Sequence, residues 1–105
     1  MVYVLESKMG EEEDIIRTNF PTAKAAAKAA WEICEENCLE MPSADWSFDH
    51  PRYGEQDCYN MMVPAGDWEP DAVFIKFMAR EASKNGSVRI SGGDDEYIRI
   101  YESSK

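Results

Sequence analysis

Three cysteines and one histidine are the residues of this 105-residue chain whose types suit metal binding or nucleophilic chemistry. Cys34 and Cys38 are four residues apart, so a helix would place both on one face. Together with Cys58 and His50 they would supply the Cys3His set that zinc accepts. Their spacing departs from the usual C-x2-C knuckle, however, and cysteine in an apolar helical stripe commonly acts as a small hydrophobe. We therefore expect no bound metal and no cofactor.

Motifs that carry catalysis or phosphate binding are absent from the sequence. Cys58 and His50 have no third residue in a recognisable pattern, and a single histidine is usually structural. There is no phosphate-binding loop, dinucleotide-binding glycine fingerprint or nucleophile elbow. The sequence therefore favours a protein that is not an enzyme.

Negative charge is concentrated in the middle of the chain. The formal net charge is −10, and eleven acids but only one base, Arg52, lie between Lys28 and Lys76. Such a field attracts basic partners and opposes phosphate backbones and anionic membranes. We expect a basic protein partner, plausibly a nucleic-acid-binding protein, and neither direct nucleic-acid binding nor membrane binding.

The candidate partner-binding residues are acids near the end of the first predicted helix and in the segment after it, together with nearby aromatic side chains. Aromatic residues supply most of the binding energy of an interface, whereas charges speed association and select the partner. The predicted partner-binding residues are Glu32, Glu35, Glu36, Glu40, Asp45, Trp46, Phe48, Asp49 and Tyr53.

The two predicted helices carry opposite charge polarity. Helix 23–38 has lysines near its start and glutamates near its end, which is unfavourable to the helix dipole. An uncompensated local cost of this kind suggests a functional surface. The second helix has the usual polarity, and its basic stripe of Lys76, Arg80 and Lys84 would allow a homodimer through a second copy's acids. Within its apolar arc, Glu81 is expected to reach Arg89 or Arg99.

Turn and capping signals divide the rest of the chain. Residues 2–5 and 14–20 predict one hairpin, and residues 88–90 and 97–101 another. A strand is expected at 58–63, followed by a helix that Asp67 caps, that has Pro70 in its first turn and that ends at Gly86. Residues 42–56 show no sustained period and are expected to form a long loop, with a short strand possible around 46–50.

The resulting fold class is a single α+β domain over residues 1–105. We expect the order β-β-α-β-α-β-β and a mainly antiparallel sheet with two helices packed on one face. A chain of this length supports one modest core. The odd cysteine count, the absence of a long apolar stretch and the lack of a signal sequence at the start favour a cytoplasmic location.

In size, acidity and compact α+β pattern, the chain resembles the small inhibitors of phages and mobile elements, including anti-CRISPR and anti-restriction proteins, some of which mimic DNA. The likeness is compositional, so it assigns no functional residue. It implies a non-enzymatic inhibitor or DNA mimic that occupies a basic, nucleic-acid-handling site on another protein. The alternative is a small-ligand-binding or catalytic domain with a pocket under the 42–56 loop.

Overall fold

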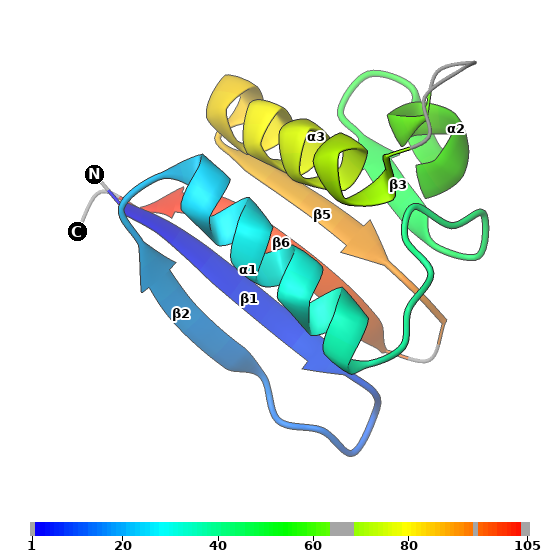
Figure 1. The fold of residues 1–105 in the computed structure, drawn as a ribbon, viewed down its shortest axis with the longest axis horizontal. Helices are drawn as coiled ribbons and strands as arrows, with labels where there is room; N and C mark the ends of the chain where they lie inside the picture. Colours follow the sequence, from blue (N-terminus) through cyan, green and yellow to red (C-terminus); the bar gives the residue numbers. More distant parts are fainter. Residues whose placement is uncertain (1, 64–68, 94, 104–105) are drawn as a thin grey trace.

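In the computed structural model, which describes residues 2–63, 69–93 and 95–103, the chain forms a two-layer α+β fold (Figure 1). Each strand pairs antiparallel with its neighbours, in the order β2-β1-β6-β5-β3-β4. The strands are β1 Val2–Met9, β2 Ile16–Phe20, β3 Ser47–His50, β4 Gly54–Asp57, β5 Ser87–Ser91 and β6 Glu96–Ser103. The helices are α1 Ala23–Glu36, α2 Cys58–Met62 and α3 Pro70–Asn85. The α+β fold and the antiparallel sheet predicted from the sequence are thereby confirmed.

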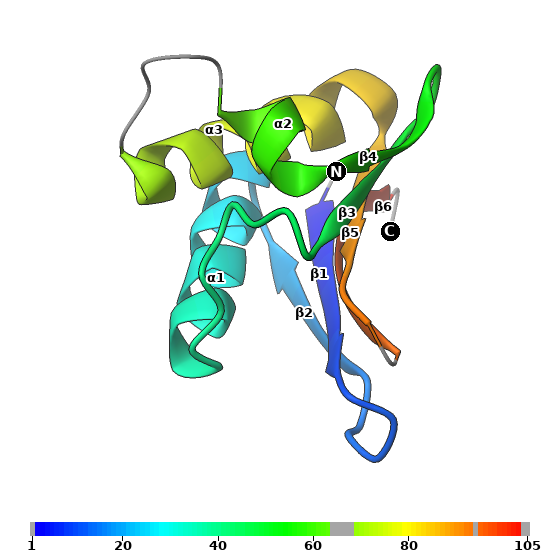
Figure 2. The same ribbon diagram turned by 90° about the vertical axis from the view of Figure 1, so that its right-hand side faces the viewer.

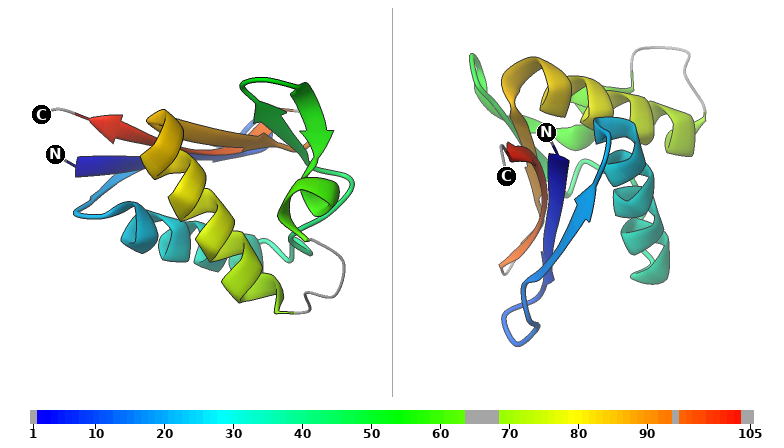
Figure 3. Two further views of the ribbon diagram at one scale, coloured as in Figure 1. Left: turned by 90° about the horizontal axis from the view of Figure 1, so that it is seen from above. Right: turned by 90° about the vertical axis from the view of Figure 1, so that its left-hand side faces the viewer.

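Both long helices cover the same face of the sheet, and the opposite face carries no helix from the described residues (Figures 2 and 3). Alternation along the central strands explains this arrangement, because side chains of successive residues point to opposite faces. The core side of the strands presents buried aliphatic residues, namely Leu5, Val88, Ile90, Ile98 and Ile100. On the open side the same strands place Glu6, Arg89, Tyr97, Arg99 and Tyr101.

Helix α1 packs closely on the sheet because its buried face consists mainly of small residues. The hydroxyl of Thr22 caps its start by accepting a hydrogen bond from the N–H of Ala25 at 3.1 Å. At the other end, Cys38 adopts a left-handed conformation with φ of 56°, and the Leu39 N–H donates to the Cys34 carbonyl at 2.8 Å. This turn follows the pattern of a Schellman C-cap. Cys38 is therefore exposed beyond the helix end and does not continue the predicted apolar stripe.

Helix α3 begins with Pro70 at a first-turn position and is followed by Gly86 at φ of 82°, as its sequence predicts. The predicted cap Asp67 lies outside the described residues. Phe74, Phe77 and Met78 are buried against the sheet and α1.

The structure corrects the prediction for residues 42–63. The expected strand at 58–63 is wrong, because Cys58–Met62 forms the short helix α2, which buries Cys58 and Met62 on one side. The expected long loop contains the β3–β4 hairpin, whose first strand continues the sheet beside β5. The observed order is therefore β-β-α-β-β-α-α-β-β.

Candidate protein-binding groove

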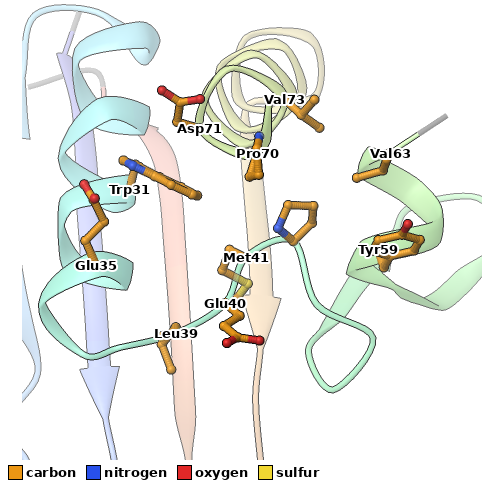
Figure 4. A pocket seen from close by; sticks show the side chains of 11 residues that line it. Trp31, Glu35, Leu39, Glu40, Met41, Tyr59, Val63, Pro70, Asp71 and Val73 are labelled. Atoms are coloured by element: carbon orange, nitrogen blue, oxygen red, sulfur yellow. The ribbon is translucent and has the colours of Figure 1, made fainter. Parts of the chain in front are cut away.

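A groove opens where the end of α1, the segment after it, α2 and the start of α3 meet (Figure 4). Its volume is about 560 Å³. The larger apolar side chains that line it are Trp31, Leu39, Met41, Tyr59, Val63 and Val73, with prolines between them. The groove thus offers an apolar floor reached from four separate parts of the fold.

Local packing fixes the floor of the groove. Trp31 extends from α1 toward α3, where its ring lies 5.5 Å from that of Phe74 at an interplanar angle of 54°. Met41, in the segment that follows the Cys38 turn, is buried. Tyr59 stands on α2 with 42% of its surface exposed, which leaves an aromatic side chain available at the groove wall.

Carboxylates stand around this apolar floor. Glu35 on α1, Glu40 after it and Asp71 at the start of α3 line the groove and are exposed, and none of the described residues that line it is basic. The C-terminal end of α1 adds the partial negative charge of the helix dipole on the same side. Glu35, Glu40 and Asp71 therefore give the apolar groove an acidic rim.

The predicted partner-binding acids do not form one continuous surface. Glu35 and Glu40 reach the groove, whereas Glu32 and Glu36 line a separate hollow between α1 and β2. Asp49 alternates with the buried Phe48 and so lies on the open face of the sheet. Asp45 is exposed in the segment before β3.

Two of the three predicted aromatic anchors are core residues. Trp46 is 6% exposed and Phe48 is 1% exposed, and the ring of Phe48 packs edge-on against Phe77 at 4.9 Å. Neither side chain is free to contact a partner in this fold. Tyr53 is 66% exposed in the β3–β4 turn, outside the groove lining. Trp31 and Tyr59 occupy the groove in their place.

Two of the three cysteines are buried, and the histidine bonds to backbone N–H groups. Burial raises the pKa of both Cys34 and Cys58 to about 12, so both thiols are neutral at physiological pH. His50 uses its Nδ1 to accept the N–H groups of Arg52 and Tyr53 at 3.0 and 3.1 Å. Among the described residues, no three His, Cys, Asp or Glu side chains are grouped so as to hold a metal.

A buried carboxylate on the open face of the sheet was missed by the sequence interpretation. Glu6 accepts hydrogen bonds from Arg17 Nε and from the Tyr97 hydroxyl, both at 2.7 Å. Burial alone would raise its pKa, but these hydrogen bonds and the charges of Arg17 and Arg99 outweigh burial and lower the pKa. Pairing the two strands of the first hairpin in register places Arg17 opposite Glu6, and this pairing could have indicated the ion pair.

The expected partners of Glu81 were also wrong. Glu81 is buried on α3, where its carboxylate lies 3.8 Å from Arg80 Nε and 3.5 Å from Asn85 Nδ2. Arg89 and Arg99 belong to the open face of the sheet, on the side away from α3. Their strand positions alternate with buried core residues, which turns both guanidinium groups away from Glu81.

Comparisons with protein-family models, with curated proteins and with solved structures found no match to this chain. Within the described residues, no helix has the length and apolar character needed to cross a membrane.

Proposed function

We propose that this protein is a non-enzymatic interaction protein that binds a basic protein partner through the acid-rimmed groove. The carrying observation is the combination of an apolar floor with the carboxylates of Glu35, Glu40 and Asp71 at its edge. A partner segment with one apolar anchor flanked by Lys or Arg matches both features. The apolar side chain would fill the groove, and the cations would meet the rim.

The floor and the rim of the groove contribute to binding in different ways. Aromatic and aliphatic contacts in a desolvated pocket supply most of the affinity, and Trp31 and Tyr59 are the groove residues suited to this. Exposed carboxylates contribute mainly to the association rate and to discrimination against acidic proteins. This division makes the two contributions separable by substitution.

A more specific form of the proposal concerns the identity of the partner. The net charge of −10 favours a partner whose basic site normally receives nucleic acid. In that case the protein acts as an inhibitor or DNA mimic of the phage or mobile-element type, resembling anti-CRISPR or anti-restriction proteins in role. The partner's binding to nucleic acid should then fall as this protein is added.

The test is affinity capture from a bacterial lysate with the tagged wild type and two variants, followed by mass spectrometry. Tyr59→Ala removes an exposed side chain from the groove, whereas Tyr53→Ala removes an exposed tyrosine outside the groove lining. We expect a basic protein to be retained by the wild type and by Tyr53→Ala and to be lost from Tyr59→Ala. Loss from Tyr53→Ala alone would assign binding to the β3–β4 turn and would contradict the proposal.

A second candidate function is the binding of a small ligand in the same groove, and its volume of about 560 Å³ favours this. The predicted pocket was under the 42–56 loop, and of that segment only Pro42 lines the groove. A ligand that binds the native state raises the melting temperature. A rise in the melting temperature with a small cation that has an apolar body, lost in Tyr59→Ala, would support this second function.

A further inference from the structure

A row of charged residues crosses the open face of the sheet, away from the groove. Cross-strand pairing joins Arg17 on β2 to Glu6 on β1, Glu6 to Arg99 on β6, and Arg99 to Arg89 on β5. Lys8 lies on the same face beside Tyr97. These five residues are four cations and one carboxylate, on a protein whose net charge is strongly negative.

Arg89 and Arg99 stand directly opposite each other, which is normally unfavourable for two like charges. The ion pairs formed by the described residues are Arg17–Glu6 and Arg80–Glu81, so neither arginine of this pair has a carboxylate partner among them. Glu6 is the nearest candidate, but its two oxygens already accept hydrogen bonds from Arg17 and Tyr97. The donors of Arg89 and Arg99 thus remain available to a bound anion.

Aromatic rings hold both guanidinium groups in place. The Arg89 guanidinium carbon lies 4.4 Å from the centre of the Tyr97 ring, and that of Arg99 lies 4.3 Å from the centre of the Tyr101 ring. Cation–π contacts of this kind restrict a long side chain without using its hydrogen-bond donors. The hydrogen bond from Tyr97 to Glu6 fixes one of the two rings in turn. Each of the two guanidinium groups is therefore held in place by its own ring.

Acidic side chains bound the basic area. A hollow of about 250 Å³ beside Arg89 is also lined by Lys8, but Asp95 and Glu96 lie at the hairpin end of it. In the other direction Asp49 on β3 lies on the same face, at the position that continues the β3–β5 register opposite Arg89. An extended polyanion would meet all of these acids, whereas a compact anion between Arg89 and Arg99 would lie away from the acids at the hairpin end.

We propose that the Arg89–Arg99 pair is a binding site for a compact phosphorylated ligand, whose phosphoryl oxygens accept hydrogen bonds from both guanidinium groups. Arginine matches phosphate geometry well, and charge-assisted hydrogen bonds of this type are the stronger ones. Exposed charges are largely screened beyond about 8 Å at physiological ionic strength. A small dianion at the pair therefore meets Arg17, Lys8 and the two arginines against Glu6 and Asp49, whereas a nucleic acid or an acidic protein surface would also meet Asp95 and Glu96.

The test is an NMR titration of the full chain with sodium pyrophosphate and, separately, with inorganic phosphate, a sugar phosphate and a short single-stranded oligonucleotide, all at constant ionic strength. We expect pyrophosphate to shift the Nε–H signals of Arg89 and Arg99. Replacing both arginines by glutamine should weaken pyrophosphate binding by at least about tenfold. The relative affinities of the free anions and the sugar phosphate then separate an inorganic ligand from a phosphate ester.

The matched control replaces Lys76 and Lys84 by glutamine, which removes the same charge from exposed positions on α3. This control should bind pyrophosphate within about twofold of the wild type, because its lost charges are on α3, which covers the opposite face of the sheet (Figure 3). Equal weakening by both double variants would overturn the proposal, as would tighter binding of the oligonucleotide than of pyrophosphate. If the double arginine variant does not fold, Arg89→Gln alone, at an exposed position, carries the comparison. The groove plays no part in this test.

Discussion

Glu6 is a buried carboxylate whose ionised form is stabilised by its neighbours. It is 6% exposed, and both of its oxygens are occupied by donors from β2 and β6. Burial and the hydrogen bond to Glu6 raise the pKa of Tyr97, while the pKa of Glu6 itself is lowered. The charged form of Glu6 therefore belongs to the folded state, and stability should depend on its ionisation.

Glu6→Gln should destabilise the fold by about 1–3 kcal/mol near neutral pH, because two donors lose a charged acceptor. A lowered folded-state pKa stabilises the protein above the unfolded-state value, and the stabilisation is lost as pH falls through the folded-state pKa. The difference between variant and wild type should therefore shrink in acid. Urea denaturation near pH 7 and near pH 3 measures it. A difference of the same size at both pH values would show that ionisation of Glu6 does not contribute.

Phe48 and Tyr53 lie five residues apart, but replacing each by alanine should change the free energy of unfolding by very different amounts. Phe48→Ala removes a buried ring packed on Phe77 and should cost about 3–5 kcal/mol. Tyr53→Ala changes an exposed side chain and should alter the free energy of unfolding by less than about 0.5 kcal/mol. Thermal denaturation of the two variants measures this difference in stability. A stable Phe48→Ala variant would mean that Phe48 is not a core residue.

At the scale of elements, the sequence predicted those with local signals and missed those that depend on tertiary contacts. Helix α3 has Pro70 at its start and Gly86 at its end, and the β5–β6 hairpin alternates clearly. The β1–β2 hairpin was predicted from β-branched and aromatic residues on either side of a turn-like run. Residues 58–63 are a short apolar run, for which periodicity does not separate a strand from a helix. Strand β4, with the sequence GEQD, has weak strand preference and is held by its pairing with β3.

The candidate groove was predictable only in part. Glu35 and Glu40 were found because the reversed charge polarity of α1 is visible in the sequence. Trp31 was missed because it occurs in a helix of small residues, and Tyr59 because its segment was assigned to a strand. Trp46 and Phe48 were misassigned because residue type alone does not tell a core aromatic from an exposed one.

Two adjacent glycines after β5, Gly92 and Gly93, test how Trp46 packs on the β5–β6 hairpin. A methyl group at Gly92 would lie 2.7 Å from Trp46 Cε2, whereas one at Gly93 would meet nothing within 4 Å. Gly92→Ala should therefore lower stability by about 1–3 kcal/mol through overpacking. Gly93→Ala should leave the melting temperature nearly unchanged. Equal stabilities of the two variants would contradict the packing of Trp46 on this hairpin.

At the scale of the whole molecule, charge is distributed unevenly between two surfaces. The groove at the helical layer is rimmed by carboxylates, while the open face of the sheet carries the arginine row. The net charge of −10 therefore describes neither surface by itself. A basic partner should be drawn to the groove, and its association should slow as salt screens the rim.

The measurement that tests the groove most directly is the affinity of the captured basic partner for three forms of the protein at low and high salt. Glu35→Gln with Glu40→Gln removes two groove carboxylates, and Glu11→Gln with Glu12→Gln removes two exposed carboxylates from the β1–β2 turn. We predict at least about tenfold weaker binding and a reduced salt dependence for the groove variant, with the turn variant close to wild type. Equal affinities of the two variants would contradict the proposed groove.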